Sequence, residues 1–222
     1  MLDALLDLVL PQACPGCGLA GSRWCHGCAD VLAAVAARPL GATAPVPAPA
    51  GFPPATAAGR YAGPLRGALL AHKERGRLAL VRPLGRALAA AILLLEPAGP
   101  VVLAPVPSDP RTVRARGHDA TRRLAGVAAR ELRRAGVPAR AAPLLAHRRR
   151  VADQAGLDSN GRRANLSGAV RVRRPVAGLQ VVVVDDVVTT GASLTEAARA
   201  LTAAGARVLG AATVAATARR AT

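Results

Sequence analysis

From residue 61 onward, the chain alternates short runs of β-branched residues with longer amphipathic stretches. This pattern is typical of βαβ units and a parallel sheet. It predicts strands over 101–106, 137–141, 180–184 and 207–214, and helices over 64–72, 78–95, 120–135 and 193–204. The four valines at 181–184 show no apolar–polar alternation, which indicates a central strand buried on both faces. We therefore expect an α/β fold, with an open parallel sheet flanked by helices.

The first sixty residues follow a different pattern. Helical patterns at 2–10 and 30–37 flank a turn-rich stretch that contains all four cysteines, and residues 39–59 are rich in proline and alanine. Proline disrupts helices and central strands, so we expect an extended linker there. The predicted organisation is a cysteine module over 1–38, a linker over 39–59 and an α/β domain over 60–222. A length of 222 residues allows one main core with a small appendage.

Composition and charge restrict the range of partners. Trp24, Phe52 and Tyr61 are the only aromatic residues, so alanine, valine and leucine must fill the core, and base stacking is disfavoured. Thirty basic residues against thirteen acidic ones give a formal net charge of +17, which favours phosphorylated metabolites, nucleic acid or anionic surfaces as partners. The arginine clusters at 148–150 and 171–174 would more often be solvated faces than binding sites.

The start of the chain lacks the pattern of a signal peptide. It has no basic residues, and Asp3 and Asp7 interrupt its apolar run. The apolar run at 87–95 is much shorter than the roughly 20 residues needed to span a bilayer. We therefore expect a cytoplasmic protein without a membrane span. In that reducing compartment a metal site is favoured over disulfides.

The four cysteines are arranged as two C-x-x-C knuckles, with one glycine in each: Cys14, Cys17, Cys25 and Cys28. Two such knuckles supply the tetrahedral set of four sulfurs that Zn²⁺ prefers, and a closed shell indicates a structural role. The alternative is a pair of redox-active C-x-x-C motifs, but no thioredoxin-like strand precedes either of them. We expect a zinc-ribbon-like module in which His26 is a bystander.

Residues 179–194 combine a buried strand, two carboxylates and a small hydroxyl-rich turn. After the strand come Asp185, Asp186, Val187, Val188, Thr189, Thr190, Gly191, Ala192 and Ser193, where the next helix begins. In an open α/β sheet, ligands bind beyond the carboxyl ends of strands, where this turn must lie. Backbone N–H groups at a tight turn and a helix N-terminus converge on an anion. Gly191 permits a close backbone approach.

The two carboxylates would repel a phosphate that they faced directly. They are better suited to vicinal ribose hydroxyls and Mg²⁺ beside the phosphate, so a sugar phosphate fits both halves of the segment. A structural role, with the Asp pair at a strand end and Thr–Gly starting a helix, is the alternative. The complete string favours ligand binding over that alternative.

The string at 179–194 is very similar to the phosphoribosyl-pyrophosphate-binding motif of type I phosphoribosyltransferases, and the wider chain resembles the ComF/GntX-like family. The resemblance covers nearly the full length. Besides the cysteine module, it includes segments at 61–66, 72–73, 104–108, 114–118, 153–154 and 162–165. The chain departs from the family at Gly117-His118-Asp119-Ala120, where Gly-Phe-Asn-Gln is common.

The resemblance implies roles for individual residues. Asp185 and Asp186 would hold the ribose hydroxyls, residues 187–193 the 5′-phosphate, and the loop 105–109 the pyrophosphate. The candidate pyrophosphate contacts are Val106, Pro107, Ser108, Lys73, Arg114, Arg116 and Arg149. Each of the four cations among them is equally compatible with a solvated surface position. A loop that covers the site is expected at 148–163.

Two functions follow as hypotheses. The first is a phosphoribosyltransferase-like enzyme that binds phosphoribosyl pyrophosphate with Mg²⁺ and transfers or exchanges the phosphoribosyl group on an acceptor that the sequence does not identify. The second, implied by family links with competence and DNA uptake, is a non-catalytic accessory protein. It would bind single-stranded DNA through charge and act with DNA-processing proteins. We expect His72, His118 and His147 to be surface or satisfied histidines, and Tyr61 to pack under the helix that starts at Pro64.

Overall fold

The computed structural model describes residues 13–148 and 168–217. Its centre is a six-stranded sheet in the order β1-β2-β8-β7-β3-β4. The strands are β1 (Gly41–Ala42), β2 (Ala55–Arg60), β3 (Val101–Pro105), β4 (Ala139–Ala141), β7 (Gln180–Val188) and β8 (Arg207–Ala216). Neighbouring strands are parallel except for β1 and β2. A separate antiparallel pair joins β5 (Leu145–His147) to β6 (Val170–Val172).

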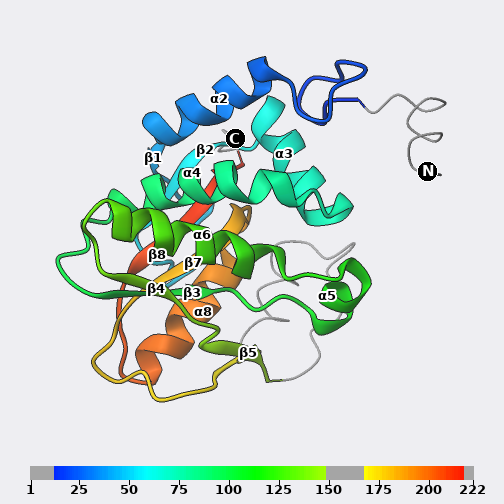
Figure 1. Ribbon diagram of the computed structural model, residues 1–222. Coiled ribbons are helices and arrows are strands. Elements are labelled where there is room, and N and C mark those ends of the chain that lie inside the picture. The colour runs from blue at the N-terminus through cyan, green and yellow to red at the C-terminus, as the bar shows by residue number, and fades with distance from the viewer. Residues whose placement is uncertain (1–12, 149–167, 218–222) are drawn as a thin grey trace.

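Helices cover both faces of this sheet. They are α2 (His26–Ala37), α3 (Gly63–Arg75), α4 (Val81–Leu93), α5 (Pro110–Arg116), α6 (Ala120–Arg134) and α8 (Ala192–Ala203), with a short 3-10 turn at Leu78–Leu80. Figure 1 shows α4 and α6 together over one face of the sheet, with α8 on the opposite side and α2 beyond α4. The expected α/β fold with a mostly parallel sheet is therefore confirmed.

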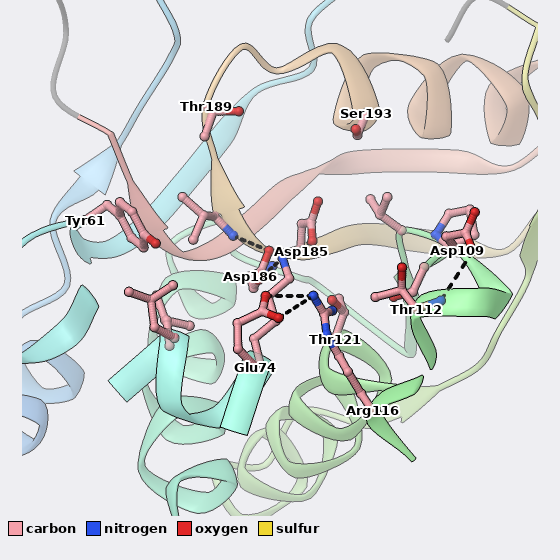
Figure 2. Close-up of a pocket in the computed structure, with 17 residues that line it drawn as sticks. Tyr61, Glu74, Asp109, Thr112, Arg116, Thr121, Asp185, Asp186, Thr189 and Ser193 are labelled. Atoms are coloured by element: carbon pink, nitrogen blue, oxygen red, sulfur yellow. Dashed lines mark hydrogen bonds and ion pairs between the residues drawn. The ribbon is translucent and has the colours of Figure 1, made fainter. Parts of the chain in front are cut away.

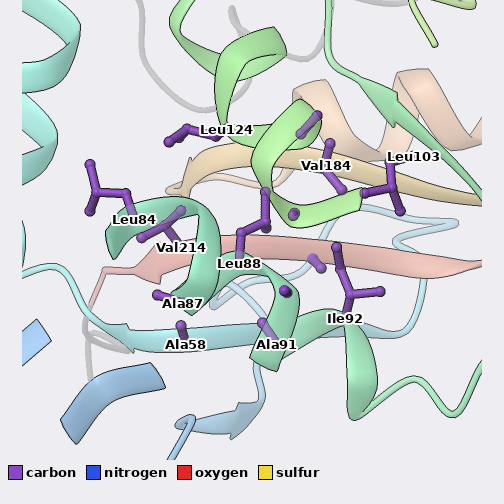
Figure 3. Packing of buried hydrophobic residues seen from close by; sticks show 14 of the residues in the cluster. Ala58, Leu84, Ala87, Leu88, Ala91, Ile92, Leu103, Leu124, Val184 and Val214 are labelled. Carbon is purple, nitrogen blue, oxygen red and sulfur yellow. The ribbon is translucent and has the colours of Figure 1, made fainter. Parts of the chain in front are cut away.

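The valine run in β7 contributes to both halves of the core. Val182 and Val184 face α4 and α6, whereas Val181 and Val183 face α8. Because successive residues of a strand point to opposite faces, a strand covered by helices on both sides needs apolar residues at every position. Figure 3 shows the first half, where residues of α4 such as Leu88 pack over the sheet.

Three parts of the chain differ from the sequence prediction. The segment 39–59, expected to be a linker, contributes β1 and β2 to the sheet. β7 continues to Val188, past the expected end at residue 184, because Asp185 and Val187 pair with residues of β8. The elements α5, β5 and β6 were not expected. The predicted helix at 2–10 lies outside the described residues, and the division into domains stays a prediction.

The strand β2 was missed because its residues are small. It reads Ala-Thr-Ala-Ala-Gly-Arg, a composition with little intrinsic preference for strands. All of its residues except Arg60 are nonetheless buried, and Ala58 lies in the same core as the residues of α4. Thr56 Oγ1 donates a hydrogen bond to the carbonyl of Ala91 in α4 at 2.7 Å. Small side chains thus let α4 lie close to the sheet.

Candidate functional site

A cavity of about 530 Å³ opens at the carboxyl ends of β3 and β7, beside α3 and α5. In parallel sheets this edge is where ligands bind. Many of the predicted site residues line it: Lys73, Val106, Pro107, Ser108, Arg116, Asp185, Asp186, Val187, Thr189 and Ser193. Figure 2 shows the two aspartates at the centre of the cavity, with Thr189 and Ser193 on one side and Glu74 and Arg116 on the other.

The two aspartates are held by the backbone of β7 and by α3. The backbone N–H of Asp186 donates to Asp185 Oδ1 at 2.8 Å, and the N–H of Val187 donates to Asp186 Oδ1 at 2.9 Å. Lys73 Nζ donates to the other oxygen of Asp186 at 2.6 Å. Asp186 is therefore fixed by both of its oxygens.

The charges of Asp185, Asp186 and Lys73 depend on one another. Burial and the adjacent Asp186 carboxylate raise the pKa of Asp185 well above the usual aspartate range. Burial of Lys73 opposes its charge, but the Asp186 carboxylate outweighs this and raises the pKa of Lys73, which stays protonated. Lys73 contacts Asp186 rather than Asp185, and a cation bound beside Asp185 would favour the ionised form of that carboxyl group. Carboxylate oxygens are ligands that suit Mg²⁺, so the residues present fit that ion.

The turn after β7 leads directly into α8. Gly191 caps α8 with a left-handed backbone (φ 76°), and no side chain caps the first N–H groups of this helix. Thr189 and Ser193 line the cavity, while Thr190 and Ala192 do not. Val187 and Val188 belong to β7, so the turn is shorter than the predicted segment 187–193. Uncapped N–H groups, helix polarity and hydroxyls together form a site suited to an anion.

The loop after β3 forms the opposite wall. Val106, Pro107 and Ser108 line the cavity, followed by Asp109. The Asp109 carboxylate accepts hydrogen bonds from the N–H groups of Arg111 (2.7 Å) and Thr112 (3.4 Å), which caps α5. Asp109 is therefore occupied within its own helix, as Asp residues at N-caps commonly are.

The predicted arginines have different positions. Arg116 lies in the cavity, where Nη2 donates to both carboxylate oxygens of Glu74 at 2.6 and 2.7 Å. Arg114 is exposed and does not line the cavity. Arg149 and most of the expected covering loop lie outside the described residues. Among the described cations, Lys73 and Arg116 are thus the two that the fold brings to the aspartates.

Sequence reasoning missed several lining residues. Tyr61 borders the cavity instead of lying only beneath α3, and Glu74, Thr112 and Thr121 also line it, whereas Asp109 belongs to the loop 105–109 that was expected there. Glu74 directly follows the predicted Lys73 in the last turn of α3, so its place beside Lys73 in the sequence was the available signal. The others come from positions whose side-chain direction depends on the tertiary fold.

His118 and Asp119, where the chain departs from the family pattern, make structural contacts. The rings of His118 and His72 lie 5.5 Å apart, both buried, and His118 Nε2 lies 3.1 Å from the carbonyl oxygen of His72. The Asp119 carboxylate accepts from the N–H of Arg122 at 3.0 Å and so caps α6. This stretch connects α3 to the start of α6.

The cysteines form a compact cluster at the edge of the fold. The four Sγ atoms lie within 4.8 Å of one another, and Cys17 Sγ and Cys25 Sγ are 3.5 Å apart. A tetrahedral Zn²⁺ with Zn–S distances of about 2.3 Å separates its sulfurs by about 3.8 Å. The first knuckle is a tight turn, and the second starts α2, with Cys25 as the N-cap. The spacing of the sulfurs therefore fits a metal ion.

The electrostatics of the cluster also favour a cation. Burial opposes ionisation of Cys14, but hydrogen bonds from the backbone, chiefly the N–H of Cys25, lower the pKa of this thiol to about 6. Burial and the neighbouring cysteine side chains raise the pKa of Cys28 far above the usual range. Four thiolates cannot share this space without a compensating charge, which a bound metal supplies.

Comparison with known proteins agrees with this architecture. Residues 122–222 match the phosphoribosyl transferase domain family. A stretch of 53 residues is 47% identical to the DNA utilization protein YhgH of Salmonella typhi and, equally, to that of Salmonella typhimurium. This match covers 24% of the chain and 23% of each relative, so the chain matches about a quarter of their length.

Among the described residues, no helix has the length and apolar character to cross a bilayer. The matched region 122–222 includes β7, the turn after it and α8, which carry the aspartates and the uncapped helix N-terminus. The strands β1, β2 and β3, from outside the match, complete the same sheet. The chain is therefore similar to the phosphoribosyl transferase domain family over residues 122–222, and a four-cysteine cluster lies near its N-terminus.

Proposed function

We propose that this protein binds phosphoribosyl pyrophosphate with Mg²⁺ in the 530 Å³ cavity and transfers or exchanges the phosphoribosyl group on an acceptor. The observation that carries this proposal is the convergence of three features on one cavity. These are the aspartate pair of β7, the uncapped N-terminus of α8 and the loop after β3. Phosphoribosyl pyrophosphate has its ribose between a 5′-phosphate and a pyrophosphate. This matches a cavity in which the aspartate pair lies between the start of α8 and the loop after β3.

Each part of the ligand has a matching part of the cavity. The 5′-phosphate accepts hydrogen bonds from the start of α8, with the hydroxyls of Thr189 and Ser193 beside it. The ribose hydroxyls bind Asp185 and Asp186. The pyrophosphate lies along Val106 to Ser108, near Arg116. Mg²⁺, when bound, neutralises charge on the leaving pyrophosphate, and carboxylate oxygens of the Asp pair are its candidate ligands.

The reaction would break the bond between C1′ and the pyrophosphate oxygen while the acceptor forms a new bond to C1′. Pyrophosphate leaves with the electron pair of the broken bond. Lys73 and Arg116 add positive charge near the leaving group, and Asp185 and Asp186 lie near the ribose, where positive charge develops. Fixed charges placed where charge develops lower the barrier.

The test is stabilisation of the folded protein by phosphoribosyl pyrophosphate with Mg²⁺. Ligand at 100 times its dissociation constant contributes about 2.7 kcal/mol, which corresponds to a rise in melting temperature of roughly 5–10 °C for a domain of this size. Asp186→Asn and Ser193→Ala should reduce this rise. Thr202→Ala, at the exposed far end of α8, is the matched control and should retain it. No rise at millimolar ligand and Mg²⁺ would contradict the proposal.

Turnover is tested separately from binding. Exchange of labelled pyrophosphate into phosphoribosyl pyrophosphate, measured with a panel of nucleobases and other candidate acceptors, would show transfer and identify the acceptor. Binding without exchange for any acceptor would leave a ligand-binding protein without transferase activity.

For the cysteine cluster, we propose a structural Zn²⁺ bound by Cys14, Cys17, Cys25 and Cys28. The support is the short distances among the sulfurs and the absence of any other His, Asp or Glu from this cluster in the described residues. Four protein ligands leave no open position for a substrate or water, so the ion has no catalytic role.

Single-stranded DNA is a second candidate ligand. The formal net charge of +17 and the name of the similar YhgH proteins, DNA utilization protein, favour it. With three aromatic residues in the chain, binding must depend on phosphate contacts and fall steeply with salt. Fluorescence anisotropy of a labelled oligonucleotide tests this. Affinity that is absent at low salt, or unchanged at high salt, would contradict electrostatic binding.

A further inference from the structure

The first cysteine knuckle lies directly against α3. A Cβ added to Gly67, in the middle of α3, would come within 1.9 Å of the carbonyl oxygen of Pro15 and 2.9 Å of Gly16 Cα. Glycine inside a helix costs roughly 0.5–1 kcal/mol relative to alanine. The close approach of the knuckle backbone therefore explains why this position of α3 has no side chain.

The cluster of cysteines holds the knuckle against α3 from the other side. A Cβ on Gly16 would lie 2.6 Å from Cys28 Sγ and 3.2 Å from the ring of Trp24. The first knuckle therefore packs between α3 and the second knuckle. Beyond the end of α3, Arg77 Nη1 donates to the carbonyl oxygen of Arg23 at 2.8 Å. The module contacts α3 at its middle and just past its end.

The same helix forms one wall of the cavity. Leu69, Leu70, Lys73 and Glu74 of α3 all line it, and Lys73 holds Asp186 at 2.6 Å. Lys73 follows Gly67 by six residues, a distance of about 9 Å along a helix. A displacement of α3 at Gly67 would therefore move Lys73 relative to the strand that carries the aspartates.

We propose that the four-cysteine cluster positions α3 for ligand binding, with Pro15, Gly16 and Gly67 as positioning residues. Loss of the metal, or displacement of the knuckle, would separate Lys73 from Asp186 and weaken binding in the cavity. Metal occupancy and ligand affinity are then coupled through one helix. The part concerning ligand affinity rests on the proposed function, whereas the position of Lys73 can be measured without any ligand.

Lys73 is the only lysine of the chain, which makes it a specific probe. Acetylation with acetic anhydride, followed by mass spectrometry of the peptide that contains Lys73, reports how firmly its amine is held by Asp186. We expect slow acetylation in the metal-loaded wild-type protein. Acetylation should be faster, on the order of tenfold, in Gly67→Ala and in wild-type protein stripped of metal.

Gly27→Ala is the matched control. Gly27 lies in the same module, but a Cβ there has no atom within 4 Å, so this variant should keep the wild-type rate. Gly67→Ala should retain one metal ion per chain by elemental analysis, which separates displacement of the knuckle from loss of metal. If Gly67→Ala does not fold by circular dichroism, Arg77→Met provides a milder change at the edge of the contact, with an intermediate rate expected.

Affinity for phosphoribosyl pyrophosphate with Mg²⁺, measured by calorimetry, completes the test. We expect the dissociation constant to rise about tenfold in Gly67→Ala and to stay unchanged in Gly27→Ala. A folded Gly67→Ala variant with wild-type acetylation and affinity would overturn the proposal. If wild-type protein fails to bind the ligand, the proposed function is wrong. The positioning role is then judged from acetylation alone, and an unchanged acetylation rate of Lys73 after metal removal would reject it.

Discussion

Within the cavity, both described cations are already paired with carboxylates of the protein. Lys73 contacts Asp186, and Arg116 contacts Glu74 through both oxygens of that carboxylate. A phosphate group that binds Arg116 must therefore compete with Glu74. The pairs keep two positive side chains oriented toward the site and moderate their attraction for anions.

Replacing Glu74 with glutamine should strengthen ligand binding. Exposed ion pairs contribute about 0.2–1 kcal/mol, so freeing Arg116 should lower the dissociation constant for phosphoribosyl pyrophosphate by about 1.5–5-fold. Glu131→Gln is the control, because Glu131 pairs with Arg86 and Arg134, which do not line the cavity. Calorimetry at low ionic strength measures the change, and weaker binding by Glu74→Gln would show that Glu74 itself contacts the ligand.

Asp185→Asn should stabilise the apo protein at neutral pH. The pKa of Asp185 is raised in the folded state by burial and by Asp186, so over the interval between its unfolded and folded values the folded protein holds a proton that the unfolded chain has lost. The free energy of unfolding therefore falls as pH rises through that interval. A tenfold difference in ionisation between the folded and unfolded states corresponds to about 1.4 kcal/mol, or roughly 3–6 °C in melting temperature.

Melting curves between pH 3.5 and 8 provide the measurement. The advantage of Asp185→Asn should disappear near and below the usual aspartate pKa of about 3.9, where the carboxyl group is protonated in both states. The variant should also lose the stabilisation by phosphoribosyl pyrophosphate. A lower melting temperature for Asp185→Asn at pH 7 would mean that the ionised carboxylate stabilises the fold.

At the level of elements, the turn between β7 and α8 is shaped by the segment once expected to be a linker. Gly191 has a φ of 76°, and an added Cβ would lie 2.7 Å from the ring of Phe52 and 2.9 Å from Pro45 Cγ. The residues preceding β2 thus pack onto the turn and support the start of α8. The anion site depends on this contact as well as on its own sequence.

Gly191→Ala should both destabilise the protein and weaken ligand binding. The left-handed backbone costs a non-glycine residue roughly 1–2 kcal/mol, and the collision with Phe52 adds to it. Gly136→Ala is the matched control, since Gly136 has a φ of 83° and no atom within 4 Å of an added Cβ. It should show the backbone cost alone and normal ligand binding. Equal effects of the two variants on melting and on binding would show that the contact with Phe52 contributes to neither.

Across the whole molecule, the cysteine module and the sheet share one core. Leu32 of α2 is buried in the cluster that contains the α4 residues, and Trp24 packs against it. The described part of the cysteine module therefore packs against the main fold. If the proposed metal ion binds there, it should contribute to the stability of the entire protein and not only to that of the cysteine module.

Metal removal should lower the melting temperature of the whole chain. Structural Zn²⁺ contributes about 10–16 kcal/mol in isolated zinc-finger peptides, and even about 3 kcal/mol corresponds to a fall of roughly 6–12 °C here. We expect one zinc per chain in protein prepared without chelators, released by thiol modification. His26→Ala should keep the metal and Cys14→Ser should lose it. A metal content near zero in the wild-type protein would contradict a zinc site.

The sequence by itself determined those features that depend on neighbouring residues. The unbroken valines of β7 identified a strand buried on both faces, because side-chain direction alternates along every strand. The aspartates, the turn and the start of α8 are contiguous in the chain, so the string at 179–194 indicated a ligand site without knowledge of the fold. The two C-x-x-C knuckles likewise indicated a metal cluster.

Only the tertiary structure decided the contacts between distant segments. β2 is a strand because β8, more than 150 residues later, pairs with it, and its alanines carry no local signal for that pairing. Lys73 contacts Asp186, which lies 113 residues later in the chain, and Pro15 packs against Gly67 on the surface of α3. Local patterns specify the kind of element, whereas such contacts depend on how all the elements pack against one another.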